Sequence, residues 1–306
     1  MAVKTVRTVA ALRSSLDGQR GDGRSVGLVP TMGAFHEGHL SLMRRARAEC
    51  STVVVSLFVN PIQFVAGEDL QSYPRDERRD AALAAETGVD LLFIPSREEV
   101  YPEGFSTAIE VSGPSQVLCG AEGSRGPGHF RGVATVVTKL FNMCLPDVAY
   151  FGQKDFQQTI VIKQLARDLD LSVRIEVCPT VRDADGLALS SRNAYLSPAE
   201  RRRALSLKRS LDAAERLVAA GAARPRQVLA TARAELEGAG IEPEYLELLR
   251  ADDLDLPRWR EGERLVIAVA ARIGRARLID NAVMTLRTAN HSYRDPSARA
   301  SDPVPG

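Results

Sequence analysis

Short apolar runs alternate with longer amphipathic stretches through residues 1–180. The apolar runs are expected to be strands, and they lie at Ser25–Pro30, Thr52–Val59, Val89–Ile94, Asp147–Phe151 and Ser172–Val177. The amphipathic stretches have helical spacing and lie near Gly38–Glu49, Arg75–Thr87, Val133–Cys144 and Phe156–Leu169. Nearly continuous apolar strands separated by helices predict an α/β fold, a Rossmann-like parallel sheet covered by helices. Such sheets bind ligands beyond the carboxyl ends of their strands.

The pattern changes after Pro179, which predicts a second, smaller α+β domain over residues 181–290. A polar stretch from Asp183 to Tyr195 leads to Ser197–Pro198, a capping residue followed by proline that marks a helix start. Two helices rich in Ala, Arg and Leu follow, and then short strands near Tyr245–Leu249, Leu265–Ala271 and Arg277–Ile279. Residues 291–306 lack periodicity and are expected to form a disordered tail.

The net charge and the spacing of the cysteines exclude several classes of protein. The 40 basic and 39 acidic residues leave a net charge of +1, which gives no general attraction to nucleic acid or anionic membrane. The longest apolar run, around Val53–Val59, is far shorter than the ~18–20 residues of a membrane span. The N-terminus lacks the apolar core of a signal peptide and is expected to form a first strand and helix. The four cysteines are widely spaced, which argues against a disulfide framework or structural zinc site. A reducing cytoplasm is the expected compartment.

The first polar cluster follows the strand that ends at Pro30. Thr31-Met32-Gly33-Ala34-Phe35-His36-Glu37-Gly38-His39 leads from this strand into a helix. A strand, a glycine-bearing turn and a helix N-terminus predict an anion site, with free backbone N–H groups and the positive end of the helix dipole. Both histidines could face the anion. The alternatives are a metal pair, for which no third ligand is evident nearby, or two surface histidines.

Three further polar clusters are candidates for the same site. In Asn60-Pro61-Ile62-Gln63 the amides suit the hydroxyls and carboxylate of a small substrate, although Asn-Pro is also a common turn. In Gly152-Gln153-Lys154-Asp155 the lysine could hold a phosphate, and the alternative is a capped surface helix with a solvated lysine. In Leu189-Ser190-Ser191-Arg192 two hydroxyls and a guanidinium could clamp a phosphate, although Ser-Ser-Arg alone is a weak signal. Walker A and GxGxxG patterns are both missing.

These clusters, in this order, resemble the pantothenate synthetase (pantoate–β-alanine ligase) family. The matching segments are PTMGAFHEGHLSL, FVNPIQF, YPR, GHFRGV, FGQKDFQQ and ADGLALSSRNAYLS along residues 30–198, followed by RLIDN near the end. The HxGH turn and the Ser-Ser-Arg-Asn segment are also similar to the two signature motifs of the wider nucleotidylyltransferase group, which includes class I aminoacyl-tRNA synthetases.

The resemblance implies an ATP-dependent ligation in two steps. The carboxylate of pantoate attacks the α-phosphate of ATP and gives pantoyl adenylate and pyrophosphate. The amine of β-alanine then attacks the acyl carbon and releases AMP and pantothenate. The family is cytoplasmic, requires Mg²⁺ and is usually homodimeric through the N-terminal domain. Residues 1–180 would then be the ATP- and pantoate-binding catalytic domain, and residues 181–290 a C-terminal lid.

The resemblance also assigns binding residues. Gln63 and Gln158 would hold pantoate, with Gln63 also near β-alanine, and Mg²⁺ would bind through the phosphates of ATP. The residues that would contact ATP are Met32, Gly33, Ala34, Phe35, His36, Glu37, Gly38, His39, Gly152, Gln153, Lys154, Asp155, Val181, Leu189, Ser190, Ser191 and Arg192.

The chemistry of the two steps sets different demands. A carboxylate is already ionised at neutral pH, so the first step needs positioning and charge stabilisation rather than a base. We expect His36, His39, Lys154 and Arg192 to stabilise the phosphates, with His39 donating a hydrogen bond or a proton to the leaving group. The second step needs a free amine, and no base for it is evident. His129 and Arg131, expected on a loop, are candidates for substrate and phosphate contacts, and Tyr73 and Asp76 are weaker candidates.

Two other functions are compatible with an HxGH turn. Another nucleotidylyltransferase would act on a phosphorylated or amino-acid substrate, but the NPIQF and KDFQQ clusters suit a small hydroxylated carboxylate. A catalytically silent, synthetase-like binding module would have lost histidines or gained a basic surface. Both histidines, Lys154 and Arg192 are present and the net charge is +1, so the sequence favours the ligase.

Overall fold

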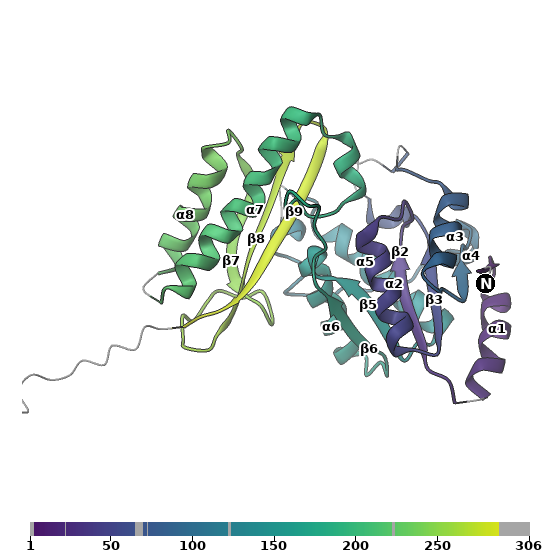
Figure 1. Ribbon diagram of the computed structural model, residues 1–306. Coiled ribbons are helices and arrows are strands. Elements are labelled where there is room, and N and C mark those ends of the chain that lie inside the picture. The colour runs from purple at the N-terminus through teal and green to yellow at the C-terminus, as the bar shows by residue number, and fades with distance from the viewer. Residues whose placement is uncertain are drawn as a thin grey trace, which may run out of the picture.

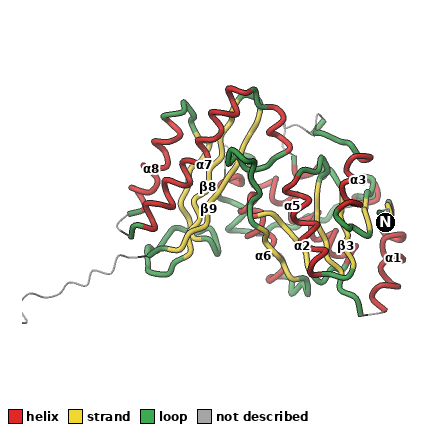
Figure 2. Tube along the Cα trace, viewed as in Figure 1, coloured by secondary structure: helices red, strands yellow, loops and turns green. Residues whose placement is uncertain are grey.

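The computed structural model describes residues 3–287 except 22, 65–69, 72, 122–123 and 222–223. The described chain forms a six-stranded parallel sheet and a separate three-stranded antiparallel sheet, as Figure 1 shows. Helices pack on both sheets (Figure 2). The predicted fold class is therefore confirmed. No helix among the described residues is both long and apolar enough to cross a membrane. The predicted tail, residues 291–306, lies outside the described residues.

The parallel sheet has the strand order β1-β4-β3-β2-β5-β6. From β2 the chain adds β3 and β4 toward one edge, and it returns to add β5 and β6 toward the other. This order puts the topological switch point, where doubly wound sheets bind ligands, at the carboxyl ends of β2 and β5. The strands are β1 (Lys4–Val6), β2 (Val26–Thr31), β3 (Thr52–Leu57), β4 (Leu91–Phe93), β5 (Val148–Gly152) and β6 (Arg174–Cys178).

Helices bury both faces of this sheet, which explains why its inner strands are largely apolar, whereas the edge strands β1 and β6 carry Lys4, Arg174 and Glu176. Along β2, Leu28 packs into one layer and Val29 into the opposite one. The first layer is covered by α1 (Val9–Gly21), α5 (Pro127–Cys144) and α6 (Phe156–Asp168), and the short α4 (Arg97–Val100) also packs there. The second layer is covered by α2 (Glu37–Glu49) and α3 (Glu77–Glu86).

Helix α5 starts earlier than the sequence pattern indicates. The GHFRGV segment was expected on a loop, and that expectation is wrong: the segment forms the first turns of α5. Gly126, with φ 77°, precedes Pro127 at the first helical position, and this pair starts the helix ahead of its apolar stripe. Gly132 then allows close packing, because a Cβ there would lie 2.5 Å from the carbonyl oxygen of Ile62.

The antiparallel sheet is built from β7 (Pro243–Arg250), β8 (Arg264–Ile273) and β9 (Ala276–Thr285). Helices α7 (Pro198–Ala219) and α8 (Pro225–Glu237) cover one of its faces. As predicted, Ser197 caps α7, and its side chain accepts a hydrogen bond from the backbone N–H of Glu200. The other face of the sheet packs on Leu118, Phe156 and Ile160 of the N-terminal region. The two sheets therefore meet near the start of α6.

Strand β9 is longer than predicted. The sequence pattern ended this strand at Ile279, because Asp280 and Asn281 interrupt its apolar run. Both side chains are nevertheless buried, with 4% and 3% of their surfaces exposed, and the strand continues to Thr285. Buried polar groups need hydrogen-bond partners, and the pairs that satisfy these two connect β9 to the candidate site.

Candidate active site

A cavity of about 350 Å³ lies between the N-terminal region and the antiparallel sheet. Its N-terminal wall includes Lys154 and Asp155, from the turn η3 (Gln153–Asp155) that follows β5, and Gln158 from α6. Ser190 and Arg192, at the turn η4 (Ser191–Tyr195), line it as well. Two of the clusters predicted from the sequence therefore meet in one cavity, although they lie more than 30 residues apart in the chain.

The histidine turn lies at the carboxyl end of β2, beside this cavity. A Cβ built on Gly38 would lie 3.9 Å from the Cβ of Leu189, which brings the turn against the segment that carries Ser190. Lys154 follows β5, the parallel neighbour of β2, and its positive charge contributes to the lowering of the pKa of both His36 and His39. The ends of β2 and β5 thus come together at the switch point.

The two histidines cap α2 and thereby fix their own protonation. His36 Nδ1 accepts a hydrogen bond from the backbone N–H of Gly38 at 3.1 Å, and His39 Nδ1 accepts one from the N–H of His36 at 3.3 Å. A neutral imidazole that accepts at Nδ1 carries its proton on Nε2. Burial lowers the pKa of His36 to about 4 and that of His39 to about 3. At neutral pH both rings are therefore uncharged donors through Nε2–H.

The backbone N–H groups of the turn have partners within the protein. Asp80 of α3 accepts hydrogen bonds from the N–H groups of Ala34 and Phe35, each at 2.8 Å. The N–H groups of His36 and Gly38 donate to imidazole nitrogens. The N–H group of Gly33 lies 3.4 Å from the hydroxyl of Thr31. The prediction of free backbone donors is therefore wrong at these five positions, because the folded turn satisfies them. The imidazoles and the dipole of α2 remain to attract an anion.

The remaining side chains of this turn have different environments. Phe35 is buried in the core under α2, and its ring centroid lies 5.6 Å from that of His39. Glu37 is exposed and forms an ion pair with Arg44. Gly33 (φ 85°) and Ala34 (φ 53°) both have left-handed backbones, which turn the chain sharply after β2.

The serine cluster follows a short two-stranded hairpin. Leu189 donates its N–H to the carbonyl of Val181 at 3.0 Å, and Arg182 and Ala188 form a β-bridge. Ser190 caps η4, because its hydroxyl accepts the N–H of Arg192 at 3.3 Å. Ser191 is half-buried in the first position of η4.

Amide side chains at the end of β3 are oriented by a chain of hydrogen bonds. Burial raises the pKa of Tyr101, so its hydroxyl stays protonated, and it donates to Asn60 Oδ1 at 2.8 Å. Asn60 Nδ2 then donates to Gln63 Oε1 at 3.0 Å. This arrangement directs Gln63 Nε2 to the sulfur of Met32 at 3.1 Å. Gln63 therefore presents a donor toward the turn after β2.

Neighbouring glutamines on α6 differ in their surroundings. Gln157 is buried and holds the loop before α5: Cys119 donates its N–H to Gln157 Oε1 at 3.0 Å, and Gln157 Nε2 donates to the carbonyl of Pro114 at 2.9 Å. Gln158 is half-buried and lines the cavity. Both side chains line the cavity, but the amide of Gln157 is engaged by this loop, so Gln158 is the glutamine placed to contact a ligand.

The four remaining candidates lie in different places, and of these four only His129 lines the cavity. His129 Nε2 accepts from Arg125 at 2.9 Å, and its Nδ1 then donates to the backbone oxygen of Gln63 at 2.7 Å. Arg131 is exposed on α5 and does not line the cavity. Tyr73 is buried against Phe64, and Asp76 caps α3. His129 thus supports the turn that carries Gln63.

Sequence reasoning missed several residues at the cavity and around it. Arg272, Arg275 and Arg277 of the β8–β9 hairpin line its C-terminal wall, and Glu244 pairs with the first and third of them at 3.1 and 2.7 Å. Asp80, Arg182 and Asn281 were also missed. Asn281 had two signals, its place in the RLIDN segment and a polar pair inside an apolar strand, while Asp80 and Arg182 had none.

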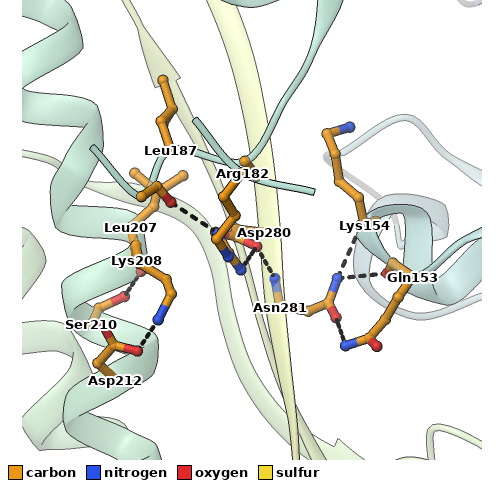
Figure 3. A network of polar contacts seen from close by, with 12 residues as sticks. Gln153, Lys154, Arg182, Leu187, Leu207, Lys208, Ser210, Asp212, Asp280 and Asn281 are labelled. Atoms are coloured by element: carbon orange, nitrogen blue, oxygen red, sulfur yellow. Dashed lines mark hydrogen bonds and ion pairs between the residues drawn. The ribbon is translucent and has the colours of Figure 1, made fainter. Parts of the chain in front are cut away.

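Figure 3 shows how Asp280 and Asn281 connect β9 to two of the predicted segments. Asp280 accepts two hydrogen bonds from Arg182, at 2.6 and 2.9 Å. Asn281 Nδ2 donates to the backbone oxygens of Gln153 at 2.9 Å and Lys154 at 3.0 Å, and its Oδ1 lies 3.3 Å from Gln153 Nε2.

No group of three or more His, Cys, Asp and Glu side chains that could hold a metal ion occurs in the part of the chain that the structure describes. Magnesium commonly binds through one or two carboxylates together with substrate phosphates and water. Asp155 lines the cavity with its side chain half exposed and one oxygen 3.7 Å from the ammonium group of Lys154, whereas both oxygens of Asp280 are bound by Arg182. Asp155 is therefore the carboxylate of this cavity that fits such a role.

The chain is similar to known ligases over nearly its whole length. A family model described as Pantoate-beta-alanine ligase matches residues 4–283. A pantothenate synthetase from Moorella thermoacetica is 50% identical over 286 residues, 92% of this chain and 99% of that protein. One from Cereibacter sphaeroides is 54% identical over 278 residues, 90% of this chain and 98% of that protein.

Solved structures give the same result. A pantothenate synthetase from Thermus thermophilus superposes with a TM-score of 0.84 at 48% identity, covering 92% of this chain and 99% of that one. A pantoate-β-alanine ligase from Francisella tularensis, complexed with β-γ ATP and β-alanine, superposes with a TM-score of 0.76 at 34% identity. That match covers 92% of this chain and 98% of the other.

Proposed function

Because this chain belongs to the pantoate–β-alanine ligase family and is an ATP-dependent ligase joining pantoate to β-alanine, we propose that it acts through pantoyl adenylate. A carboxylate oxygen of pantoate attacks the α-phosphorus, and the bond to the β-phosphate breaks to release pyrophosphate. The amine of β-alanine then attacks the acyl carbon, loses a proton and displaces AMP. The observation that carries this proposal is that the turn with His36 and His39 and the turn with Lys154 follow two neighbouring parallel strands, β2 and β5, at the switch point.

The first step needs stabilisation of negative charge on the phosphates. Lys154 supplies a positive charge from η3, and Arg192 supplies a planar set of donors from η4. The two imidazoles of the neighbouring turn after β2 carry Nε2–H donors. We assign these four residues to the α-phosphate and the departing pyrophosphate. Attack by an ionised carboxylate requires no general base.

The protonation state of the two histidines limits the catalytic roles that they can have. Both pKa values lie well below 7, so in the free protein neither ring is an imidazolium that could give up a proton. Each Nδ1 lone pair already accepts a backbone N–H, so neither ring is a general base. We therefore propose that His39 acts as a hydrogen-bond donor to the leaving group and not as a proton donor at neutral pH.

The other predicted contacts keep their assignments in this proposal. Gln63 and Gln158 hold pantoate, and the donor that Gln63 presents suits a carboxylate or hydroxyl oxygen. Gln63 also lies near β-alanine. The remaining ATP contacts come from Met32–Gly38, Gly152–Asp155, Val181 and Leu189–Ser191. Because Phe35 is buried, its contribution is limited to the backbone.

Magnesium would be held by the phosphates of ATP, with Asp155 as the carboxylate within the cavity. When bound, it would neutralise phosphate charge and favour departure of pyrophosphate. The residues of the protein orient the triphosphate, and none of the roles above depends on a direct metal ligand.

We also propose the organisation of the enzyme. Residues 1–180 are the ATP- and pantoate-binding domain and residues 181–290 a lid, supported by a cavity that both regions line. A homodimer through the N-terminal domain follows from the family resemblance. A cytoplasmic location is consistent with four free, buried cysteines. Neither nucleic acid nor a membrane is a partner in this proposal.

Isotope transfer tests the intermediate directly. Pantoate labelled with ¹⁸O in its carboxylate, mixed with ATP, Mg²⁺ and β-alanine, should give AMP that carries one ¹⁸O atom, because the attacking oxygen stays with phosphorus. Pantothenate formed with unlabelled AMP would refute the adenylate. Label in AMP without formation of pantothenate would point to transfer of adenylate to another acceptor.

A further inference from the structure

We propose that Asn281 and Asp280 of β9 are positioning residues that hold the two phosphate-binding segments, η3 and the 182–192 segment, at a fixed separation. This inference rests on the function proposed above. Neither side chain was assigned a role by motif, and neither lies on a segment expected to contact ATP. The C-terminal sheet would then set the geometry of adenylation in addition to covering the cavity.

Asn281 fixes the backbone that carries Lys154. Its Nδ2 group donates to two successive carbonyl oxygens, those of Gln153 and Lys154, at 2.9 and 3.0 Å. Its Oδ1 accepts from the side chain of Gln153. In Figure 3 the ammonium group of Lys154 points away from this network. Asn281 therefore holds the main chain at Lys154, while the ammonium group of Lys154 remains available to the cavity.

Asp280 fixes the second segment through Arg182. The two carboxylate oxygens bind the guanidinium at 2.6 and 2.9 Å, and Arg182 also donates to the carbonyl of Gly186 at 3.2 Å. Arg182 forms the β-bridge with Ala188, directly before the segment that carries Ser190 and Arg192. Bidentate pairing fixes direction as well as distance. The hairpin is thus oriented from β9.

Adjacent residues of a strand point to opposite faces, so one dipeptide can hold two segments at once. Asn281 pairs across the sheet with Ala268, whose face packs on the N-terminal region, and Asp280 with Val269, whose face packs under α7. Continuous pairing of β8 with β9 from Arg264–Thr285 to Ile273–Ala276 keeps this dipeptide in place.

The chemistry of each side chain is specific. Two carbonyl oxygens require a donor with two hydrogens, which the amide of Asn281 provides. Aspartate has nearly the same shape but would set a carboxylate against two carbonyl oxygens. Misplacement of a reacting group by about 1 Å can cost about 100-fold in rate. We therefore expect loss of this amide to slow adenylation far more than it weakens ATP binding.

The test compares Asn281→Ala and Asn281→Asp with Asn142→Ala, a control on the exposed face of α5 whose amide donates to the carbonyl of Thr138. Pantoate-dependent ATP–pyrophosphate exchange is measured per folded molecule, with the folded fraction taken from circular dichroism at the assay temperature. Both Asn281 variants should lose about 10- to 100-fold in kcat with less than about threefold change in KM for ATP. The control should match the wild type.

A second measurement observes Lys154 itself. The chain has five lysines, Lys4, Lys139, Lys154, Lys163 and Lys208, so ¹³C-carbonyl-lysine labelling gives five signals. The Lys154 signal is identified by its loss in Lys154→Arg. In Asn281→Asp this signal should shift while the other four stay in place.

The possible results separate the two proposals. Wild-type protein that gives neither exchange nor pantothenate from all three substrates would refute the proposed function. Wild-type exchange with unchanged kcat in folded Asn281 variants would overturn the positioning role alone. A shift of all five lysine signals, with activity lost in proportion to the folded fraction, would show a structural role and would also overturn it.

Discussion

The imidazole rings of His36 and His39 lie 4.1 Å apart, centroid to centroid, and each accepts a backbone hydrogen bond through Nδ1. Two adjacent rings in a partly buried turn cannot both be protonated without repulsion. The fold removes that repulsion by keeping both rings neutral, and it leaves the proton of each ring on Nε2. The pH dependence of stability and the effect of replacing His39 both depend on this pair.

Stability should fall as the pH is lowered below about 6.5. The folded-state pKa values, about 4 for His36 and about 3 for His39, lie below the ordinary value of 6.5. Between pH 6.5 and 4 the unfolded state therefore binds more protons, and stability that is fully present above pH 6.5 is lost. Each histidine contributes a slope of up to about 1.4 kcal/mol per pH unit. Urea titrations at several pH values measure the free energy of unfolding. This free energy should depend less steeply on pH in His36→Gln than in the wild type.

His39→Ala should impair both the helix cap and the chemistry. The loss of a capping acceptor costs about 1 kcal/mol, and loss of one donor to a developing charge costs about 100- to 1000-fold in kcat. Thermal melting and pyrophosphate exchange measure the two effects. His39→Gln, which keeps an amide donor, should retain more activity than alanine. Equal activity of the two variants would contradict a donor role.

Lys154→Ala should lower the adenylation rate far more than it weakens binding of the finished adenylate. The ammonium group matters most while negative charge develops on the departing pyrophosphate, because the finished adenylate keeps only the α-phosphate. Exchange rates and calorimetric binding of a non-hydrolysable adenylate analogue measure both quantities. Lys163→Ala, exposed on α6, is the matched control. Equal losses in rate and binding would refute this role for Lys154.

Asp80→Asn should disturb the histidine turn from a distance. Asp80 accepts the N–H groups of Ala34 and Phe35, and asparagine can accept only one of them and leaves the other without a partner. We expect a loss of about 1–3 kcal/mol in the free energy of unfolding, together with reduced exchange activity. Asp168→Asn on the exposed face of α6 serves as the control. Unchanged stability in Asp80→Asn would contradict the proposal that Asp80 holds the histidine turn in place.

The two glutamines of α6 should respond in opposite ways. Gln158→Ala should raise KM for pantoate with little change in melting temperature, because this side chain lines the cavity. Gln157→Ala should lower the melting temperature, because three backbone groups lose their partner. Steady-state kinetics and calorimetry on the pair distinguish the roles. A stable Gln157→Ala with raised KM would reverse the assignment.

The sequence predicted both sheets because their signals are local. Strands buried on both faces are apolar without interruption, and Ser197–Pro198 marks the start of α7 by its own chemistry. The clusters at the ends of β2 and β5 were predicted to share a site because parallel strands end at one edge. Starts and ends that depend on packing, such as those of α5 and β9, were missed.

The parts of the site that could not be predicted depend on partners distant in the chain. Asp80 lies 46 residues from Ala34, and Asn281 lies 127 residues from Lys154. The sequence around Asp80 and around Asn281 contains no local pattern that indicates such partners. The prediction of free backbone donors in the histidine turn failed for the same reason, because Asp80 accepts hydrogen bonds from two of them.

Pantoate-dependent exchange of ³²P-pyrophosphate into ATP, measured without β-alanine, tests the central proposal most directly. A reversible adenylation step predicts exchange that requires pantoate and Mg²⁺, is abolished by omission of either, and falls strongly in Lys154→Ala. Pantothenate synthesis from all three substrates, with no exchange in the absence of β-alanine, would contradict a freely reversible pantoyl-adenylate intermediate.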